Sequence, residues 1–193
     1  MLDNLNKYRI LLASNSPRRK ELLTGLGIDY EVKTLPDVDE SFPAELKGEE
    51  IPVYIARKKA EAYREMLLAD SLVITADTIV WLEGEMLGKP CDEADAAAML
   101  RKLSGKTHQV ITGVCLTTPD WQKSFSAISE VRFAFLTNDE IDFYVHRFRP
   151  LDKAGSYGVQ EWIGFIGVES ISGSYFNVMG LPIQRLYREL KQL

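Results

Sequence analysis

Ser14-Asn15-Ser16-Pro17-Arg18-Arg19-Lys20-Glu21-Leu22-Leu23 follows a short apolar run at residues 8–13 and opens a segment with helical leucine spacing. The apolar run predicts a buried strand. Ser16 is a favourable N-cap, and Pro17 suits the first helical position because its missing N–H would have no partner there. Gly27 is expected to close the helix. The stretch therefore predicts a strand, a tight turn and a helix.

The expected helix carries cations at its positive end. Arg18, Arg19 and Lys20 occupy the first turn, where the helix dipole disfavours each of them by roughly a few tenths of a kcal/mol. The arrangement makes sense if an anion binds there. Backbone N–H groups, the hydroxyls of Ser14 and Ser16 and the guanidinium groups would then converge on a phosphate. A solvated basic turn is the alternative.

Length and composition bound the class of protein. The 193 residues fit one domain, with room for two lobes around a cleft, and 46% hydrophobic residues suffice for a core. The net charge of −5 argues against nucleic-acid binding by bulk electrostatics. We expect no signal peptide and no membrane span. Cys91 and Cys115 lie in unrelated segments, so a reduced cytoplasmic protein without disulfides is expected.

The middle of the chain offers candidate catalytic groups. Residues 34–50 read as an acidic, proline-containing loop, which is either solvated or uses Glu40 or a neighbour to bind a divalent metal. A helix is expected over 52–68, with Lys59 at the edge of its apolar stripe, from where it could reach into a cleft.

The run at 71–82 is apolar on both faces, which predicts a central strand. Asp77 is the anomaly in it, because a carboxylate there must be paired, metal-bound or solvated at a strand end. A hairpin turn at 83–85 would return Lys89 close to Asp77.

The second half of the chain continues the alternation of helices and strands. We expect a helix from Asp92 to Leu103, antiparallel strands at 107–118 and 126–136, a helix after the Thr137 capping box, and a last helix to about residue 190. Residues 104–107 end like a P-loop, but Leu100 stands where its first glycine is required, so a P-loop is rejected.

Two further features bear on function. The glycine-rich segment 154–160 ends at Gln160, whose amide could read a base edge, although a plain turn explains the glycines equally well. His108 and His146 are far apart, which gives no support to a zinc site or a Ser-His-Asp triad.

Several more motifs stand in order along the chain. They are A-R-K-K-A at 56–60, A-D-T-I-V at 76–80, G-K-P at 88–90, S-G-K-T-H-Q-V at 104–110, D-K-A-G-S-Y-G-V-Q at 152–160 and G-S-Y-F-N-V-M-G-L-P at 173–182. Together with S-N-S-P-R-R at 14–19, they resemble the Maf family of nucleoside triphosphate pyrophosphatases across nearly the whole chain.

The resemblance implies a single Maf-like domain over 1–193 with an α/β fold. That fold is a mixed twisted sheet with flanking helices and two lobes around a central cleft, as in inosine triphosphatases. It also implies hydrolysis of a nucleoside triphosphate to the monophosphate and pyrophosphate with a divalent cation, Mg or Mn, often by a homodimer.

Site residues follow from the resemblance position by position. Asp77 matches the catalytic proton acceptor, and the other catalytic positions match Glu40, Lys59 and Lys89. Glu40 and Asp77 are the expected metal ligands, with Asp39 as the alternative to Glu40. The phosphate-binding candidates are Ser14, Ser16, Arg18 and Arg19. The positions linked to base choice match Arg18, Thr78 and Gln160, which favours dTTP and UTP as substrates.

Two other functions remain open at this stage. One is a house-cleaning pyrophosphatase for modified purine triphosphates. The other is a nucleotide-binding regulator of cell division that does not cleave its ligand, in line with the family's older label as a septum-formation inhibitor. The proton acceptor expected at Asp77 argues against the second, because a mere sensor does not need one.

Overall fold

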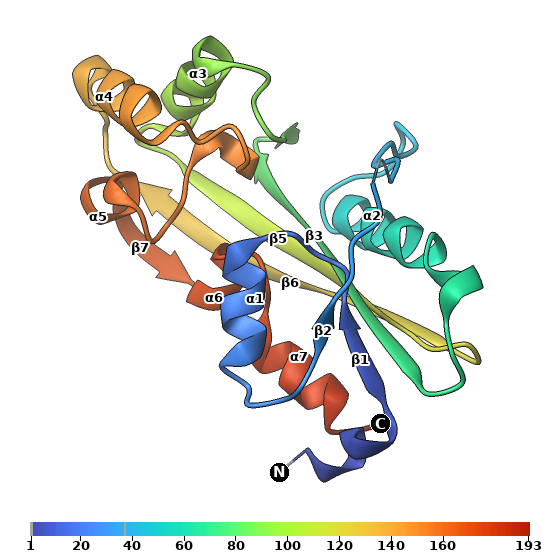
Figure 1. Ribbon diagram of the computed structural model, residues 1–193. Helices are drawn as coiled ribbons and strands as arrows, with labels where there is room; N and C mark the ends of the chain where they lie inside the picture. The colour runs from blue at the N-terminus through green and yellow to red at the C-terminus, as the bar shows by residue number, and fades with distance from the viewer. Residues whose placement is uncertain (1, 37) are drawn as a thin grey trace. The chain divides into compact units, whose positions relative to one another are not determined.

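The computed structural model describes residues 2–36 and 38–193 (Figure 1). The strands are β1 (Arg9–Leu12), β2 (Glu31–Val32), β3 (Ser71–Leu82), β4 (Glu85–Leu87), β5 (Thr107–Thr117), β6 (Gln122–Phe133) and β7 (Val168–Ser172). The α-helices are α1 (Pro17–Thr24), α2 (Glu50–Glu61), α3 (Glu93–Leu103), α4 (Asn138–Phe148), α5 (Trp162–Gly167), α6 (Tyr175–Val178) and α7 (Ile183–Leu190). Short 3-10 helices are η1 (Asp3–Lys7), η2 (Arg64–Met66) and η3 (Ala154–Ser156).

Within these described residues the strands form one mixed sheet in the order β2-β1-β3-β5-β6-β7, with β4 paired to β3. Strand β1 runs parallel to both β2 and β3, whereas β3/β4 and β6/β7 are antiparallel. The doubly apolar β3 lies inside the sheet, as its sequence predicts, because both of its faces are buried. The expected α/β fold with a mixed sheet and flanking helices is confirmed.

The chain divides into two compact units. Unit 1 comprises the residues up to Asp77, 112–127 and 180–193, and unit 2 comprises 78–111 and 128–179. In unit 1 the two ends of the chain meet, because the Asn4 side chain donates to the Leu190 carbonyl at 2.8 Å (Figure 1). In unit 2, helices α3 and α4 lie side by side (Figure 1).

Helix α2 packs tightly against the sheet within unit 1. Ala56 and Ala60 are fully buried and contact Cys115 on β5. A Cβ atom on Gly113 would lie 2.3 Å from the backbone carbon of Pro52, so only glycine lets β5 approach the first turn of α2 this closely.

Several boundaries differ from the sequence expectation. Helix α1 ends at Thr24 with Gly25 at its C-cap, earlier than the expected closure at Gly27. Helix α2 ends at Glu61, seven residues early, because Tyr63 turns into the core and its hydroxyl pairs with backbone groups of Lys33 and Leu35. Strand β6 ends at Phe133, since the backbone of Ala134 bonds to residues outside the strand.

Two capping expectations agree with the structure. Asp92 caps α3, and Thr137 forms the capping box of α4. Residues 104–106 link α3 to β5 rather than a strand to a helix, in line with rejection of the P-loop. Cys91 and Cys115 are free thiols. No helix in the described part of the chain has the length and apolar character needed to cross a membrane.

Candidate active site

Three predicted charged groups of unit 1 meet at the middle of β3. The Nζ atom of Lys59 lies 2.7 Å from Oδ1 of Asp77 and 2.8 Å from Oε1 of Glu40. The side chains of Lys59 and Asp77 are 15% and 13% exposed, whereas that of Glu40 is 48% exposed. The anomalous carboxylate of the apolar strand is therefore paired, and the attraction between the two inner charges is only partly screened by water. We name Asp77, Lys59 and Glu40 the carboxylate–lysine cluster.

A buried hydroxyl aligns the two elements that form this cluster. Thr75 on β3 donates from Oγ1 to the carbonyl of Ala56 on α2 at 2.7 Å. Lys59 stands one helical turn after Ala56, and Asp77 stands two residues after Thr75 on the same side of the strand. The sequence did not reveal this contact of Thr75, although a threonine in an apolar strand beside Asp77 was the available signal.

Arg19 ties the N-terminal turn of α1 to the same point of β3. Its Nη1 donates to the carbonyl of Ala76, and its Nε donates to the carbonyl of Gly180, both at 2.8 Å. Burial lowers the pKa of Arg19, while the negative charge of Asp77 acts in the opposite direction. The guanidinium therefore has a structural role that the sequence did not reveal, in addition to the phosphate contact that is still a prediction.

The two predicted serines shape the turn before α1. The buried Ser14 accepts a hydrogen bond at Oγ from the N–H of Ser16 at 3.2 Å, and Ser16 caps α1 by accepting from the N–H of Arg19 at 3.4 Å. The N-cap prediction for Ser16 is confirmed. Arg18 is half-buried in the first turn of α1, and its contact with phosphate stays a prediction.

The loop before α2 separates the roles of its neighbouring acids. Asp39 accepts a hydrogen bond from Lys58 at 2.6 Å and further bonds from Ser41, and the Lys58 contact is the main cause of its lowered pKa. Glu40, not Asp39, contacts Lys59. Of the two alternatives left open by the sequence, Glu40 is therefore the one that lies beside Asp77.

The other predicted site residues belong to unit 2. Thr78 directly follows Asp77 on β3 and is half-buried. The expected hairpin forms, with Val80 opposite Leu87, and the exposed Lys89 follows two residues after the end of β4. The segment that ends at Gln160 is tied to this hairpin, because the N–H of Gly155 donates to the carbonyl of Gly88 at 3.0 Å.

Gln160 carries an unusual acceptor. Its Oε1 atom is buried, and among the residues that the structure describes it has no hydrogen-bond partner. A buried carbonyl oxygen without a donor costs free energy, roughly 1–3 kcal/mol. A donor that reached this atom would recover that free energy.

The carboxylates of Asp77 and Glu40 determine whether a divalent metal fits this site. Over residues 2–36 and 38–193, no group of three or more His, Cys, Asp or Glu side chains could hold an ion by itself. Asp77 and Glu40 nevertheless present two carboxylates around one Lys59 ammonium. Mg²⁺ commonly binds one or two carboxylates and completes its shell with waters and substrate phosphates. The donor set therefore fits a metal that binds together with a triphosphate.

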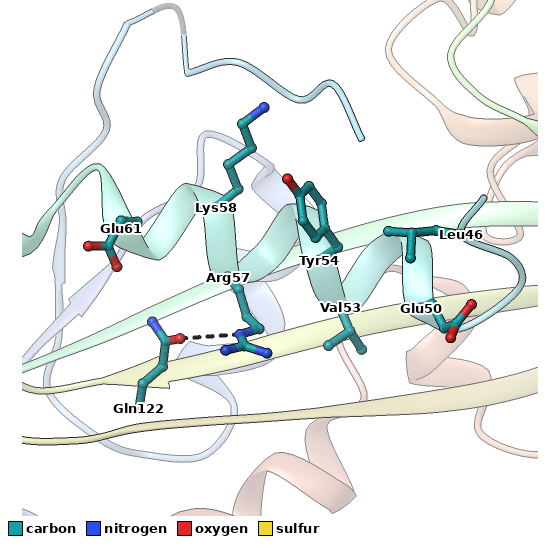
Figure 2. Close-up of a pocket in the computed structure, with 8 residues that line it drawn as sticks. All are labelled: Leu46, Glu50, Val53, Tyr54, Arg57, Lys58, Glu61 and Gln122. Carbon is teal, nitrogen blue, oxygen red and sulfur yellow. Dashed lines mark hydrogen bonds between the residues drawn. The ribbon is translucent and has the colours of Figure 1, made fainter. Parts of the chain in front are cut away.

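A hollow of about 600 Å³ lies on another face of α2 (Figure 2). Figure 2 shows Arg57 reaching Gln122, whose Oε1 accepts a hydrogen bond from Nε at 3.3 Å. The residues that line this hollow are Leu46, Glu50, Val53, Tyr54, Arg57, Lys58, Glu61 and Gln122. None of these is a predicted site residue, and the hollow is distinct from the carboxylate–lysine cluster.

Comparison with known proteins identifies the family. The family described as Maf-like protein matches residues 9–193. A Bacteroides fragilis protein named dTTP/UTP pyrophosphatase is 72% identical over 193 residues, which cover 100% of both chains. A Phocaeicola vulgatus protein of the same name is 69% identical over 193 residues, again 100% of both. The solved structure of the Staphylococcus aureus Ham1 protein has the same fold, with a TM-score of 0.54, 23% identity and coverage of 94% of this chain and 99% of that one. The chain therefore belongs to the Maf family.

Proposed function

We propose that this chain hydrolyses dTTP and UTP to the nucleoside monophosphate and pyrophosphate, with the carboxylate–lysine cluster as its hydrolytic centre. The observation that carries the proposal is the Lys59 ammonium held between Asp77 and Glu40, beside the turn that Arg19 ties to Ala76. The name dTTP/UTP pyrophosphatase borne by relatives that are up to 72% identical over the full length supports the same reaction and substrates.

In this mechanism Asp77 orients the attacking water and accepts its proton as the water oxygen bonds to the α-phosphorus. Lys59 holds the Asp77 carboxylate in position through its 2.7 Å contact. Arg18, Arg19 and Lys89 bind the triphosphate and stabilise the charge on the departing pyrophosphate. Ser14 and Ser16, which hold the turn before α1, contribute their hydroxyls to the binding of phosphate oxygens.

A divalent cation, Mg²⁺ or Mn²⁺, belongs to the proposal, with Asp77 and Glu40 as its protein ligands. When bound, it polarises the phosphoryl oxygens and neutralises their charge. We also propose a single domain, a cytoplasmic location, which the free thiols of Cys91 and Cys115 suit, and a homodimer.

The preference for dTTP and UTP is assigned to Arg18, Thr78 and Gln160. The imide N3–H of uracil and thymine is a donor that suits the buried acceptor of Gln160. Cytosine lacks this donor, since its N3 is an acceptor. A site built around a hydrogen bond rejects an analogue that leaves its buried partner unpaired.

Pyrophosphate release tests the reaction and the base preference together. The substrates are dTTP, UTP, CTP, GTP, ITP and 7-methyl-GTP, each with Mg²⁺ and with Mn²⁺. The proposal predicts strong release from dTTP and UTP. Activity confined to ITP or 7-methyl-GTP would keep the chemistry and overturn the assigned base preference. Binding without release from any nucleotide would instead favour the non-catalytic regulator.

N3-methyl-UTP tests the acceptor at Gln160 separately. This analogue keeps the triphosphate and the sugar but cannot donate from N3. We expect its kcat/KM to be about a hundredfold lower than that of UTP, since the buried acceptor would stay unpaired. Equal kcat/KM for the two nucleotides would contradict the role of Gln160 as an acceptor for the base.

A further inference from the structure

A series of polar contacts within unit 2 joins the exposed Asp152 and the buried Lys153 to residues on either side of Gln160. The Nζ atom of Lys153, whose side chain is 9% exposed, lies 2.7 Å from Asp152 and 3.1 Å from Oε1 of Glu161. The other oxygen of Glu161, Oε2, accepts a hydrogen bond from the hydroxyl of Tyr144 on α4. That hydroxyl in turn accepts from the N–H of Gly158 at 3.1 Å.

These contacts determine which group donates and which accepts in each hydrogen bond of the series. Burial, together with the bond to the Glu161 carboxylate, raises the pKa of Tyr144, so the phenol stays protonated and donates to Glu161. Loss of the hydroxyl would leave the N–H of Gly158 buried without this partner. Loss of the Glu161 charge would leave the Lys153 ammonium with Asp152 as its other carboxylate contact.

Gln160 lies in sequence between Val159 and Glu161, and both of these residues pack closely against glycines. A Cβ atom on Gly164 would lie 2.0 Å from the carbonyl oxygen of Val159, so the backbone before Gln160 rests directly on α5. A Cβ atom on Gly158 would lie 2.7 Å from Cδ of Glu161, so the side chain after Gln160 covers that glycine. Both sequence neighbours of Gln160 are therefore held in place by packing.

We propose that Tyr144, Glu161 and Lys153 form a positioning network that aims the Gln160 amide and thereby sets the preference for dTTP and UTP. The inference rests on the proposed function. The three residues act through Gln160, so their removal changes base discrimination more than phosphate chemistry. A site that must hold a polar group to within a fraction of an ångström needs such support behind it.

Two matched tyrosine variants separate positioning from stability. Tyr144→Phe removes the hydroxyl that joins Glu161 to Gly158. The control, Tyr157→Phe, removes another buried hydroxyl of unit 2, which bonds to His108 at 2.8 Å. We expect Tyr144→Phe to lower the ratio of kcat/KM for UTP to that for CTP about tenfold, mainly through a higher KM for UTP. Tyr157→Phe should lower the melting temperature but leave this ratio unchanged.

If Tyr144→Phe does not fold, Glu161→Gln tests the same network through the same ratio of kcat/KM. This substitution keeps the size of the side chain and removes its charge. The double variant Tyr144→Phe/Glu161→Gln completes a double-mutant cycle. If the two residues belong to one network, the double variant lowers the ratio of kcat/KM for UTP to that for CTP by less than the product of the two single effects.

The outcomes distinguish this inference from the proposed function. Wild-type protein that does not prefer UTP over CTP would overturn both. A wild-type preference that survives in Tyr144→Phe and Glu161→Gln, or that falls equally in Tyr157→Phe, would overturn the positioning network alone.

Discussion

At the scale of single residues, Lys58 and Lys59 offer a direct comparison of neighbours with different surroundings. Lys59→Met would leave Asp77, which is 13% exposed, without its cation, and we expect kcat to fall about a hundredfold. Lys58→Met removes an ion pair with Asp39, whose side chain is 65% exposed, and should change kcat by less than about twofold. Steady-state kinetics with dTTP checks both. Equal losses in the two variants, or normal turnover in Lys59→Met, would contradict the cluster.

His108 makes the stability depend on pH. Burial lowers the pKa of His108 from 6.5 to about 4. Between these pH values, His108 is protonated in the unfolded chain and neutral in the folded one. The free energy of unfolding therefore falls as the pH drops from 6.5 to 4, by about 3 kcal/mol in total. Above pH 6.5 this contribution does not change.

Urea unfolding at pH 7 and pH 5 checks this dependence. His108→Gln should lose less stability than the wild type over the interval, because Gln does not titrate. An equal loss in both proteins would show that His108 is not the source.

At the scale of elements, the contact of Gly113 on β5 with Pro52 on α2 is a tight packing constraint between a strand and a helix. Gly113→Ala would put a Cβ atom 2.3 Å from backbone, so α2 must move and carry Lys59 away from Asp77. We expect a loss of about 3 kcal/mol in the free energy of unfolding and a lower kcat. Gly25→Ala is the control, since Gly25 has helical dihedral angles and the nearest atom is 3.3 Å away. Similar losses in both variants would contradict the special role of this contact.

The elements also show how far the sequence predicts the fold. Strand β3 has the expected bounds because its apolar pattern and its turn are local signals. Helix α2 ends seven residues before the end that the sequence predicts. The reason is that the buried Tyr63 stops the helix through tertiary contacts, which leave no local signal.

The site likewise combines residues with a local sequence signal and residues that only tertiary contacts bring in. Asp77 stood out because a carboxylate interrupts an apolar run. The Arg19 contact with Gly180 joins residues 161 positions apart and has no local signal. The bond from Thr75 to Ala56 likewise depends on how α2 meets β3.

At the scale of the whole molecule, the chain passes between the two units four times, at 77/78, 111/112, 127/128 and 179/180. The first three of these points lie inside β3, β5 and β6. We expect unfolding in a single cooperative transition, with equal calorimetric and van't Hoff enthalpies. Fluorescence of single-tryptophan variants that keep Trp121 of unit 1 or Trp162 of unit 2 should give the same midpoint. Two separate midpoints would contradict this.

The central claim is that Asp77 accepts the proton during hydrolysis of a nucleoside triphosphate. The most direct measurement is pyrophosphate release from dTTP by the wild type and by Asp77→Asn, with circular dichroism and melting temperature to verify folding. Asn keeps the size of the side chain but is a far weaker base. We predict a folded variant with kcat at least about a hundredfold lower than that of the wild type. A folded Asp77→Asn protein that turns over dTTP at a near-normal rate would contradict the account.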